Sequence, residues 1–78
     1  MNIKELLGRE VLDASAVVLG KVSDVDFDIH KGIINHIVVK AGIMKRYEVS
    51  FNEIARIGDK ILLNTSEKDL TRKTTIGM

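Results

Sequence analysis

The segment Val22–Ile29 carries three carboxylates that could bind a metal ion, because Asp24, Asp26 and Asp28 alternate with apolar residues. Carboxylate oxygens suit Ca²⁺, which needs several of them at about 2.3–2.6 Å. The alternation indicates a β-strand, in which alternate side chains share a face and lie about 6.5–7 Å apart. An extended strand therefore does not bring three carboxylates to one ion. We interpret the aspartates as the solvated face of a strand and expect no metal ion and no cofactor.

The two histidines, His30 and His36, are the other side chains that could act as ligands or as a general base. A two-residue turn at Lys31-Gly32 would place His36 opposite Phe27 and leave the two histidines far apart. The chain has no Cys, and no motif supplies a nucleophile together with a base and an orienting third group. We therefore predict that the protein is not an enzyme and has no catalytic residues.

The charge of the chain is nearly balanced, since 12 basic and 11 acidic residues give a formal net charge of +1. Nucleic-acid-binding proteins usually carry a basic excess, so a nucleic-acid partner is not expected. The cluster of Lys40, Lys45 and Arg46 beside Tyr47 is the one feature that favours an alternative, an RNA- or ribosome-associated processing or maturation module. No stretch approaches the roughly 18 apolar residues of a membrane helix, and the N-terminus does not resemble a signal peptide. We expect a cytoplasmic protein without membrane insertion.

The strongest structural signal is an antiparallel hairpin formed by Val22–Ile29 and Ile33–Lys40, joined by a turn at His30-Lys31-Gly32. The second strand is β-branched at five of its eight positions and apolar on both faces. Gly20, just before the hairpin, is expected at a turn or a bulge. Further short strands are expected at Glu10–Leu12, Tyr47–Val49 and Lys60–Asn64.

Two capping boxes predict short helical turns. In the first, Asn2 stands three residues before Glu5; in the second, Ser50 stands three residues before Glu53. The second box is expected to open one or two turns of helix that end at Gly58.

These elements predict a mostly β fold, a small barrel of five to six short antiparallel strands with one short helical turn. The barrel domain is expected at residues 1–64, and residues 65–78 form a C-terminal extension. The sequence leaves the extension open between a strand, a short helix that starts at Ser66 and a loose tail.

Several segments along the chain are similar to the PRC-barrel domain, in the order in which that family has them. They are Leu7–Asp13, Leu19–Asp28, His36–Lys40, Tyr47–Phe51, Ile57-Gly58-Asp59 and Ile61–Leu63. Two positions depart from the usual pattern: Ala16 stands where the family often has Gly, and Ser50 where it often has Pro. The resemblance implies a small PRC-type β-barrel, of the short stand-alone kind common in archaea.

The resemblance also implies a role. Family members include the cytoplasmic part of the photosynthetic reaction-centre H subunit and a domain of a ribosome-maturation factor, and some stand-alone archaeal members are associated with cell division. Their shared theme is contact with other proteins, and the family has no common set of catalytic residues. A protein-binding adaptor or scaffold is therefore expected.

The strand Ile33–Lys40 has more apolar surface than a barrel core can cover. With the two-residue turn, Ile34, His36 and Val38 share the face of the apolar residues of Val22–Ile29, whereas Ile33, Ile37 and Val39 share the face of the aspartates. A one-residue change in turn length would exchange which row is inside, and either way one apolar row is left over. The uncovered row needs either a helix or tail of the same chain, or a second copy or partner. We expect a homodimeric adaptor that docks onto another protein, with Ile37, Val39, Ile43 and Met44 in the interface.

Overall fold

The computed structural model describes residues 1–74, so the last four residues of the predicted C-terminal extension lie outside the described part of the chain. The elements, in chain order, are α1 (Ile3–Leu6), β1 (Glu10–Leu12), β2 (Val18–Asp28), β3 (Ile33–Ala41), β4 (Lys45–Ser50), the 3₁₀ turn η1 (Phe51–Glu53), β5 (Ile54–Ile57), β6 (Ile61–Leu63) and α2 (Glu67–Thr74).

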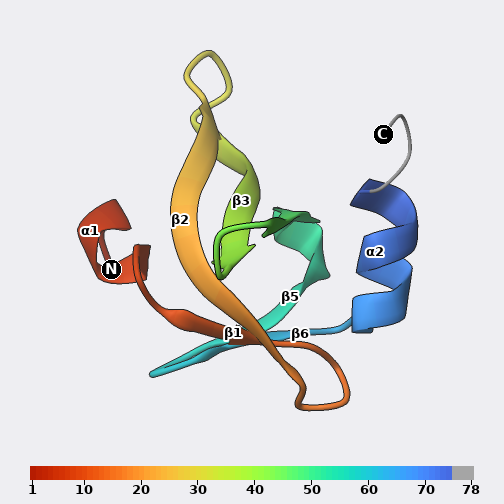
Figure 1. Ribbon diagram of the computed structural model, residues 1–78. Coiled ribbons are helices and arrows are strands. Elements are labelled where there is room, and N and C mark those ends of the chain that lie inside the picture. The colour runs from red at the N-terminus through yellow and green to blue at the C-terminus, as the bar shows by residue number, and fades with distance from the viewer. Residues whose placement is uncertain (75–78) are drawn as a thin grey trace.

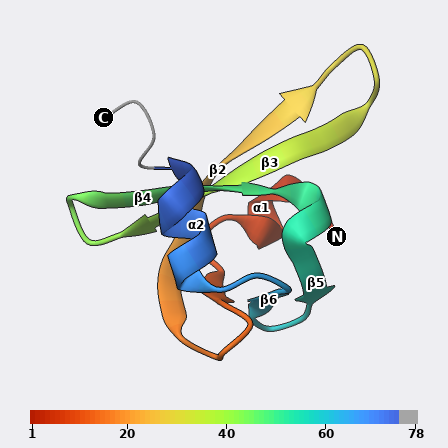
Figure 2. The ribbon, with the colours of Figure 1, turned by 90° about the vertical axis from the view of Figure 1, so that its right-hand side faces the viewer.

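The six strands form one curled sheet in the order β4-β3-β2-β1-β6-β5 (Figure 1). This confirms the predicted mostly β, barrel-like fold. The pairing is mixed, because β1 runs parallel to β6 while the other neighbours are antiparallel. The prediction of antiparallel strands throughout is therefore wrong at this one pair. Two α-helices accompany the sheet, and α2 packs against β4 (Figure 2).

The second capping box starts a much shorter helical segment than predicted. The Glu53 carboxylate accepts a hydrogen bond from the Ser50 N–H at 3.1 Å, as a capping box requires. The helical turn nevertheless ends at Glu53, and the chain continues as β5 rather than as a helix to Gly58. In β5, Ile54 pairs with Leu63 and packs against the core, so strand pairing outweighs the local helix signal.

The turn of the β2–β3 hairpin begins earlier than predicted. Asp28 accepts hydrogen bonds from the N–H groups of His30 and Lys31 at 3.0 and 3.1 Å, and its carbonyl accepts one from Gly32. This arrangement is typical of an aspartate that starts a turn, and Gly32 closes it at φ +69°. The turn therefore spans Ile29–Gly32, and the predicted pairing of His36 with Phe27 is wrong, since His36 lies opposite Asp26.

Two one-residue bulges set the rest of the hairpin register. Between the pairs Val22–Val39 and Asp24–Val38, β2 contains the extra residue Ser23. Between Asp26–His36 and Phe27–Ile34, β3 contains the extra residue Asn35. Each bulge changes which alternate residues of its strand share a face.

The register places Ile34, Ile37 and Val39 on the core face of β3, because residues directly opposite one another share a face. Their partners on β2 are Phe27, Val25 and Val22, in that order. Neither of the two predicted rows on β3 is correct, since the bulge at Asn35 shifts the pattern within the strand. Ile37 and Val39 have no exposed surface and belong to the core.

Helix α2 shows that part of the C-terminal extension packs onto the barrel. Its first turn is held by Ser66, whose side chain accepts a hydrogen bond from Asp69 N–H and whose carbonyl accepts one from Leu70 N–H. Leu70 is fully buried in the core. Of the three possibilities for the extension, the helix that starts near Ser66 is the one observed.

A buried carboxylate, that of Asp13, links helix α2 to the turn between β1 and β2. Its Oδ1 accepts hydrogen bonds from the N–H groups of Ser15 and Val17, and its Oδ2 accepts one from Glu67, all at 2.8 Å. Burial alone would raise the pKa of Asp13, but these three donors stabilise the charged form more strongly and lower the pKa below its ordinary value.

We predict that Asp13→Asn lowers the free energy of unfolding at pH 7 by about 1–3 kcal/mol, because the amide NH₂ cannot accept a hydrogen bond. The lowered pKa means that the stabilisation by the wild-type carboxylate is complete above the unfolded pKa. It is lost as pH falls through the lower folded pKa. Urea unfolding at pH 7 and at successively lower pH should show the difference between the two proteins shrinking on acidification.

Asp59→Asn is the matched control, since this aspartate is exposed in the turn between β5 and β6. Its free energy of unfolding should stay within about 0.5 kcal/mol of wild type at pH 7. A stability difference for Asp13→Asn that does not change with pH would contradict the role given to the carboxylate.

Candidate functional site

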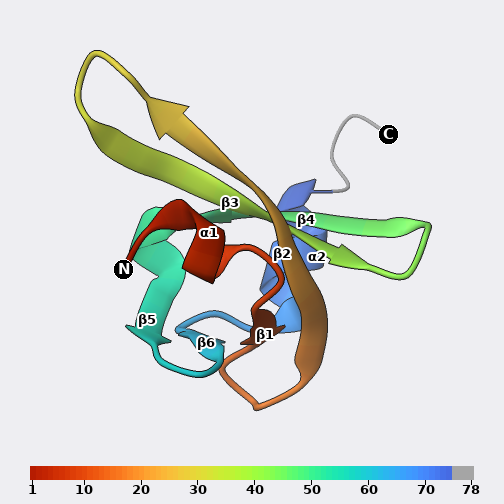
Figure 3. The ribbon, with the colours of Figure 1, turned by 90° about the vertical axis from the view of Figure 1, so that its left-hand side faces the viewer.

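A group of exposed and partly exposed apolar side chains lies at the far end of the β2–β3 hairpin. We call this group the hairpin patch, and it consists of Phe27, Ile29, Ile33, Ile34 and Phe51. Phe27 and Ile33 are about half exposed, at 48% and 49%. The end of the hairpin projects from the body of the domain (Figures 1 and 3).

The hairpin patch is exposed because the β2–β3 pair continues beyond the strands on either side of it. Pairing of β1 with β2 ends at Glu10–Lys21, and pairing of β4 with β3 ends at His36–Ser50. Val25 still packs against the core. Phe27 and Ile34 follow on the same face, beyond the last pairs with β1 and β4, and Phe27 is half exposed.

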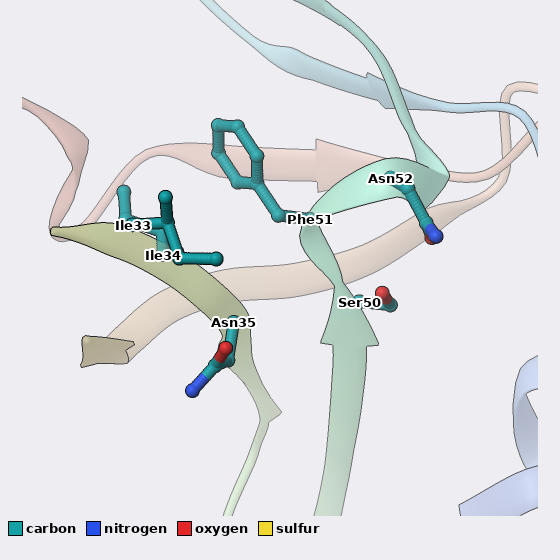
Figure 4. Close-up of a pocket in the computed structure, with 6 residues that line it drawn as sticks. All are labelled: Ile33, Ile34, Asn35, Ser50, Phe51 and Asn52. Carbon is teal, nitrogen blue, oxygen red and sulfur yellow. The ribbon is translucent and has the colours of Figure 1, made fainter. Parts of the chain in front are cut away.

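The turn η1 adds an aromatic side chain to the hairpin patch. Its position is fixed by the Glu53–Ser50 hydrogen bond and by a bond from Asn64 N–H to the Glu53 carbonyl at 2.9 Å. Phe51 then faces β3 across a shallow groove of about 430 Å³ (Figure 4). The groove is lined by Ile33, Ile34, Asn35, Ser50, Phe51 and Asn52. It combines an apolar floor with neutral polar edges and has no charged residue in its lining.

The family model of the PRC-barrel domain matches residues 1–70 of this chain. The chain belongs to the PRC-barrel domain family. The matched region covers the whole sheet and the first turn of α2, including the core residue Leu70. No curated protein matches the sequence. PRC-barrel domains serve in general as protein-interaction modules. No helix among residues 1–74 is long and apolar enough to cross a membrane.

In this PRC-barrel domain each of the three aspartates of β2 accepts a hydrogen bond from a nearby group of the same hairpin. Asp24 accepts a hydrogen bond from Val25 N–H at 2.8 Å, Asp26 accepts one from the Asn35 side chain at 3.0 Å, and Asp28 holds the hairpin turn. Within residues 1–74, no group of three or more His, Cys, Asp or Glu side chains has the geometry of a metal site.

The two histidines lie at different places on the hairpin. His30 is exposed in the turn, and His36 Nδ1 is 3.8 Å from the Asp26 carboxylate on the outer face. The structure does not bring the two together on one side of the sheet.

The four predicted interface residues fall into two groups. Ile37 and Val39 are buried in the core of their own domain, so the prediction that they form an exposed row is wrong. Ile43 and Met44 are exposed, at 98% and 91%, in the turn between β3 and β4. Their contact with a partner stays a prediction, and they lie at the opposite end of β3 from the hairpin patch (Figure 3).

The basic cluster also lies near the β3–β4 turn. Lys40 is paired with Arg46 across the two strands, and Lys45 begins β4. Tyr47 is buried, and its hydroxyl donates to the Glu67 carboxylate at 3.0 Å. The aromatic ring is therefore not available to stack on a nucleic-acid base beside these cations.

We predict effects of very different size on stability for two isoleucines of β3. Ile37→Ala should lower the free energy of unfolding by about 2–4 kcal/mol, because it leaves a cavity in the core. Ile33→Ala should change it by less than about 1 kcal/mol, because this side chain is half exposed on the hairpin patch. Urea unfolding of the two variants measures both values, and equal losses of stability would contradict the register described for β3.

Proposed function

We propose that this PRC-barrel domain is a non-catalytic adaptor that captures another protein by burying the hairpin patch. The observation that carries the proposal is the continuation of the core face of β2 and β3 beyond the covered part of the sheet. Contiguous exposed apolar side chains with a polar rim are typical of sites of protein contact.

The composition of the hairpin patch supports protein binding over binding of a small polar molecule. Two aromatic side chains, Phe27 and Phe51, are exposed at 48% and 39%, and buried aromatic residues often dominate the free energy of protein association. The groove between them and β3 is shallow and contains no charged group that would orient a small ligand.

The rim of the hairpin patch is polar and partly pre-ordered. Asn35, which lines the groove, donates to the Asp26 carboxylate of the outer face at 3.0 Å. Ser50 is held by Glu53. Polar groups held in this way can set the orientation of a partner with little additional ordering on binding.

The test is capture of proteins from a lysate of the native host with tagged wild type and two tagged variants. Phe27→Ser should lower the amount of captured partner by about tenfold or more, since it removes an aromatic anchor. Ile43→Ser is the matched control, because it removes an equally apolar and more exposed side chain at the other end of β3. Quantitative mass spectrometry of the captured proteins measures both effects.

Each outcome has a clear meaning once thermal unfolding has shown that both variants stay folded. A partner lost with Phe27→Ser and retained with Ile43→Ser supports the hairpin patch. A partner lost only with Ile43→Ser would place the contact at the β3–β4 turn and overturn the proposal. A solution mass of two chains that falls to one with Phe27→Ser would show that a second copy, rather than another protein, covers the hairpin patch.

A further inference from the structure

The outer part of β2 has one unpaired backbone edge. Two hydrogen bonds, Gly8 N–H to the Val22 carbonyl at 2.8 Å and Val22 N–H to the Arg9 carbonyl at 3.0 Å, end its contacts on the side away from β3. From Ser23 to Asp28, no other strand of the described chain pairs with this edge. A strand edge of this length is a template for a further strand.

A hydrogen bond identifies the backbone groups that face outward along this edge. The Val25 N–H donates to the carboxylate of Asp24 at 2.8 Å, which places it on the side of β2 away from β3. Successive residues of a strand direct their N–H and C=O groups to alternate sides, so the groups of Phe27 face the same way as those of Val25. The edge thus presents the backbone groups of these two residues. The Val25 N–H already donates to Asp24, so an added strand would replace that carboxylate with one of its own carbonyls.

The side chains along the same edge alternate in character. Val25 and Phe27 are on the apolar core face, and Asp24, Asp26 and Asp28 alternate with them on the outer face. None of the three carboxylates forms an ion pair with a Lys or Arg among residues 1–70, where the ion pairs found are His36–Asp26 and Lys60–Glu10.

We propose that the partner contributes an extended segment that adds as a strand to the free edge of β2, with apolar residues alternating with Lys or Arg. Opposite residues of paired strands share a face, so apolar residues of the segment would lie beside Val25 and Phe27. Its cations would lie beside the three aspartates. This inference rests on the proposed function and specifies the chemistry of the bound segment.

The aspartates also disfavour the simplest competing occupant, a second copy of the chain. Pairing β2 with β2 of another copy would bring core face to core face and the aspartate row of one copy to that of the other. Like charges opposite one another destabilise strand pairing. A cationic, alternating segment satisfies the same backbone groups and turns the repulsion into attraction.

The test uses two synthetic seven-residue peptides, one with alternating lysine and valine and one with glutamate in place of lysine. Fluorescence anisotropy at low salt should show binding of the lysine peptide to the full chain at least about tenfold tighter than binding of the glutamate peptide. Amide exchange followed by NMR should show the Val25 and Phe27 N–H groups exchanging at least about tenfold more slowly in the complex. Equal affinities, or no protection of these two amides, would overturn the proposal.

Control peptides separate strand pairing from general attraction between charges. A lysine–valine peptide that is N-methylated on the residues facing β2 keeps its charge and side chains but loses edge hydrogen bonds. Its affinity should fall about tenfold or more, because strand addition derives much of its affinity from the main chain. Unchanged affinity of this peptide would show purely electrostatic binding and contradict strand addition.

Protein variants test the charge complementarity. Asp26→Asn should weaken binding of the lysine peptide several-fold, whereas Asp59→Asn, with the same loss of charge in an exposed turn, should leave it unchanged. Equal weakening by both variants would contradict recognition at β2.

Strand addition can be disproved while the proposed adaptor function still holds. If Phe27→Ser abolishes capture of a partner while that partner leaves the Val25 amide unprotected, the hairpin patch binds by side-chain contacts alone. Strand addition is then excluded and the adaptor function stands. If the free chain already protects these amides at the mass of a dimer, a second copy occupies the edge and the inference is overturned.

Discussion

The alignment of β2 with β3 determines which residues of this domain form the core and which form the binding surface. Each bulge changes which alternate residues share a face, so the one at Ser23 and the one at Asn35 together place Val22, Val25 and Phe27 opposite Val39, Ile37 and Ile34. Without the bulge at Asn35, the outer half of β3 would present its other face to the core side. The apolar row that is buried at Ile37 would then not continue into the exposed groove beside Phe51.

A second constraint closes the other end of the domain and leaves the hairpin as the uncovered part. Asp13 ties the β1–β2 turn to the first turn of α2, and Ala14 N–H donates to the Thr65 carbonyl nearby. Helix α2 is thereby held against β4, where Leu70 fills the core and Glu67 accepts the hydrogen bond of Tyr47. Because α2 packs against β4, the described part of the extension does not cover the hairpin patch.

The sequence predicted the elements of this fold better than their alignment. Alternation in Val22–Ile29, the run of β-branched residues in β3 and the capping pair Asn2–Glu5 rest on local preferences, and the structure contains all three features. The register depends on where the turn starts. Asp28, four residues before Gly32, was the residue that could have indicated a turn starting there. The bulges at Ser23 and Asn35 contain no glycine, the signal that marked Gly20, so the sequence did not indicate them.

The surface residues were harder to predict for the same reason. The bulge at Asn35 was not predicted, so Ile37 and Val39 were assigned to the outer face although they lie in the core. Phe51 was assigned to a helix and was not considered as a surface residue. The helix predicted from Ser50 was correct for one turn. The rest of it is the strand β5, because β5 pairs with β6, a contact that the local sequence does not indicate. The local preference for a helix is outweighed because Ile54 and Ile57 pack against the core when the segment is a strand.

The aspartates of β2 limit nonspecific association of a strand whose other face is apolar and partly exposed. A long edge strand that exposes Phe27 and Ile29 is a liability, because its free backbone groups can pair with any extended chain. Alternating carboxylates on the outer face make pairing with an identical strand unfavourable but leave the apolar face accessible. The same carboxylates thus repel an identical strand and attract a cationic one, so their charge contributes to the choice of partner as well as to affinity.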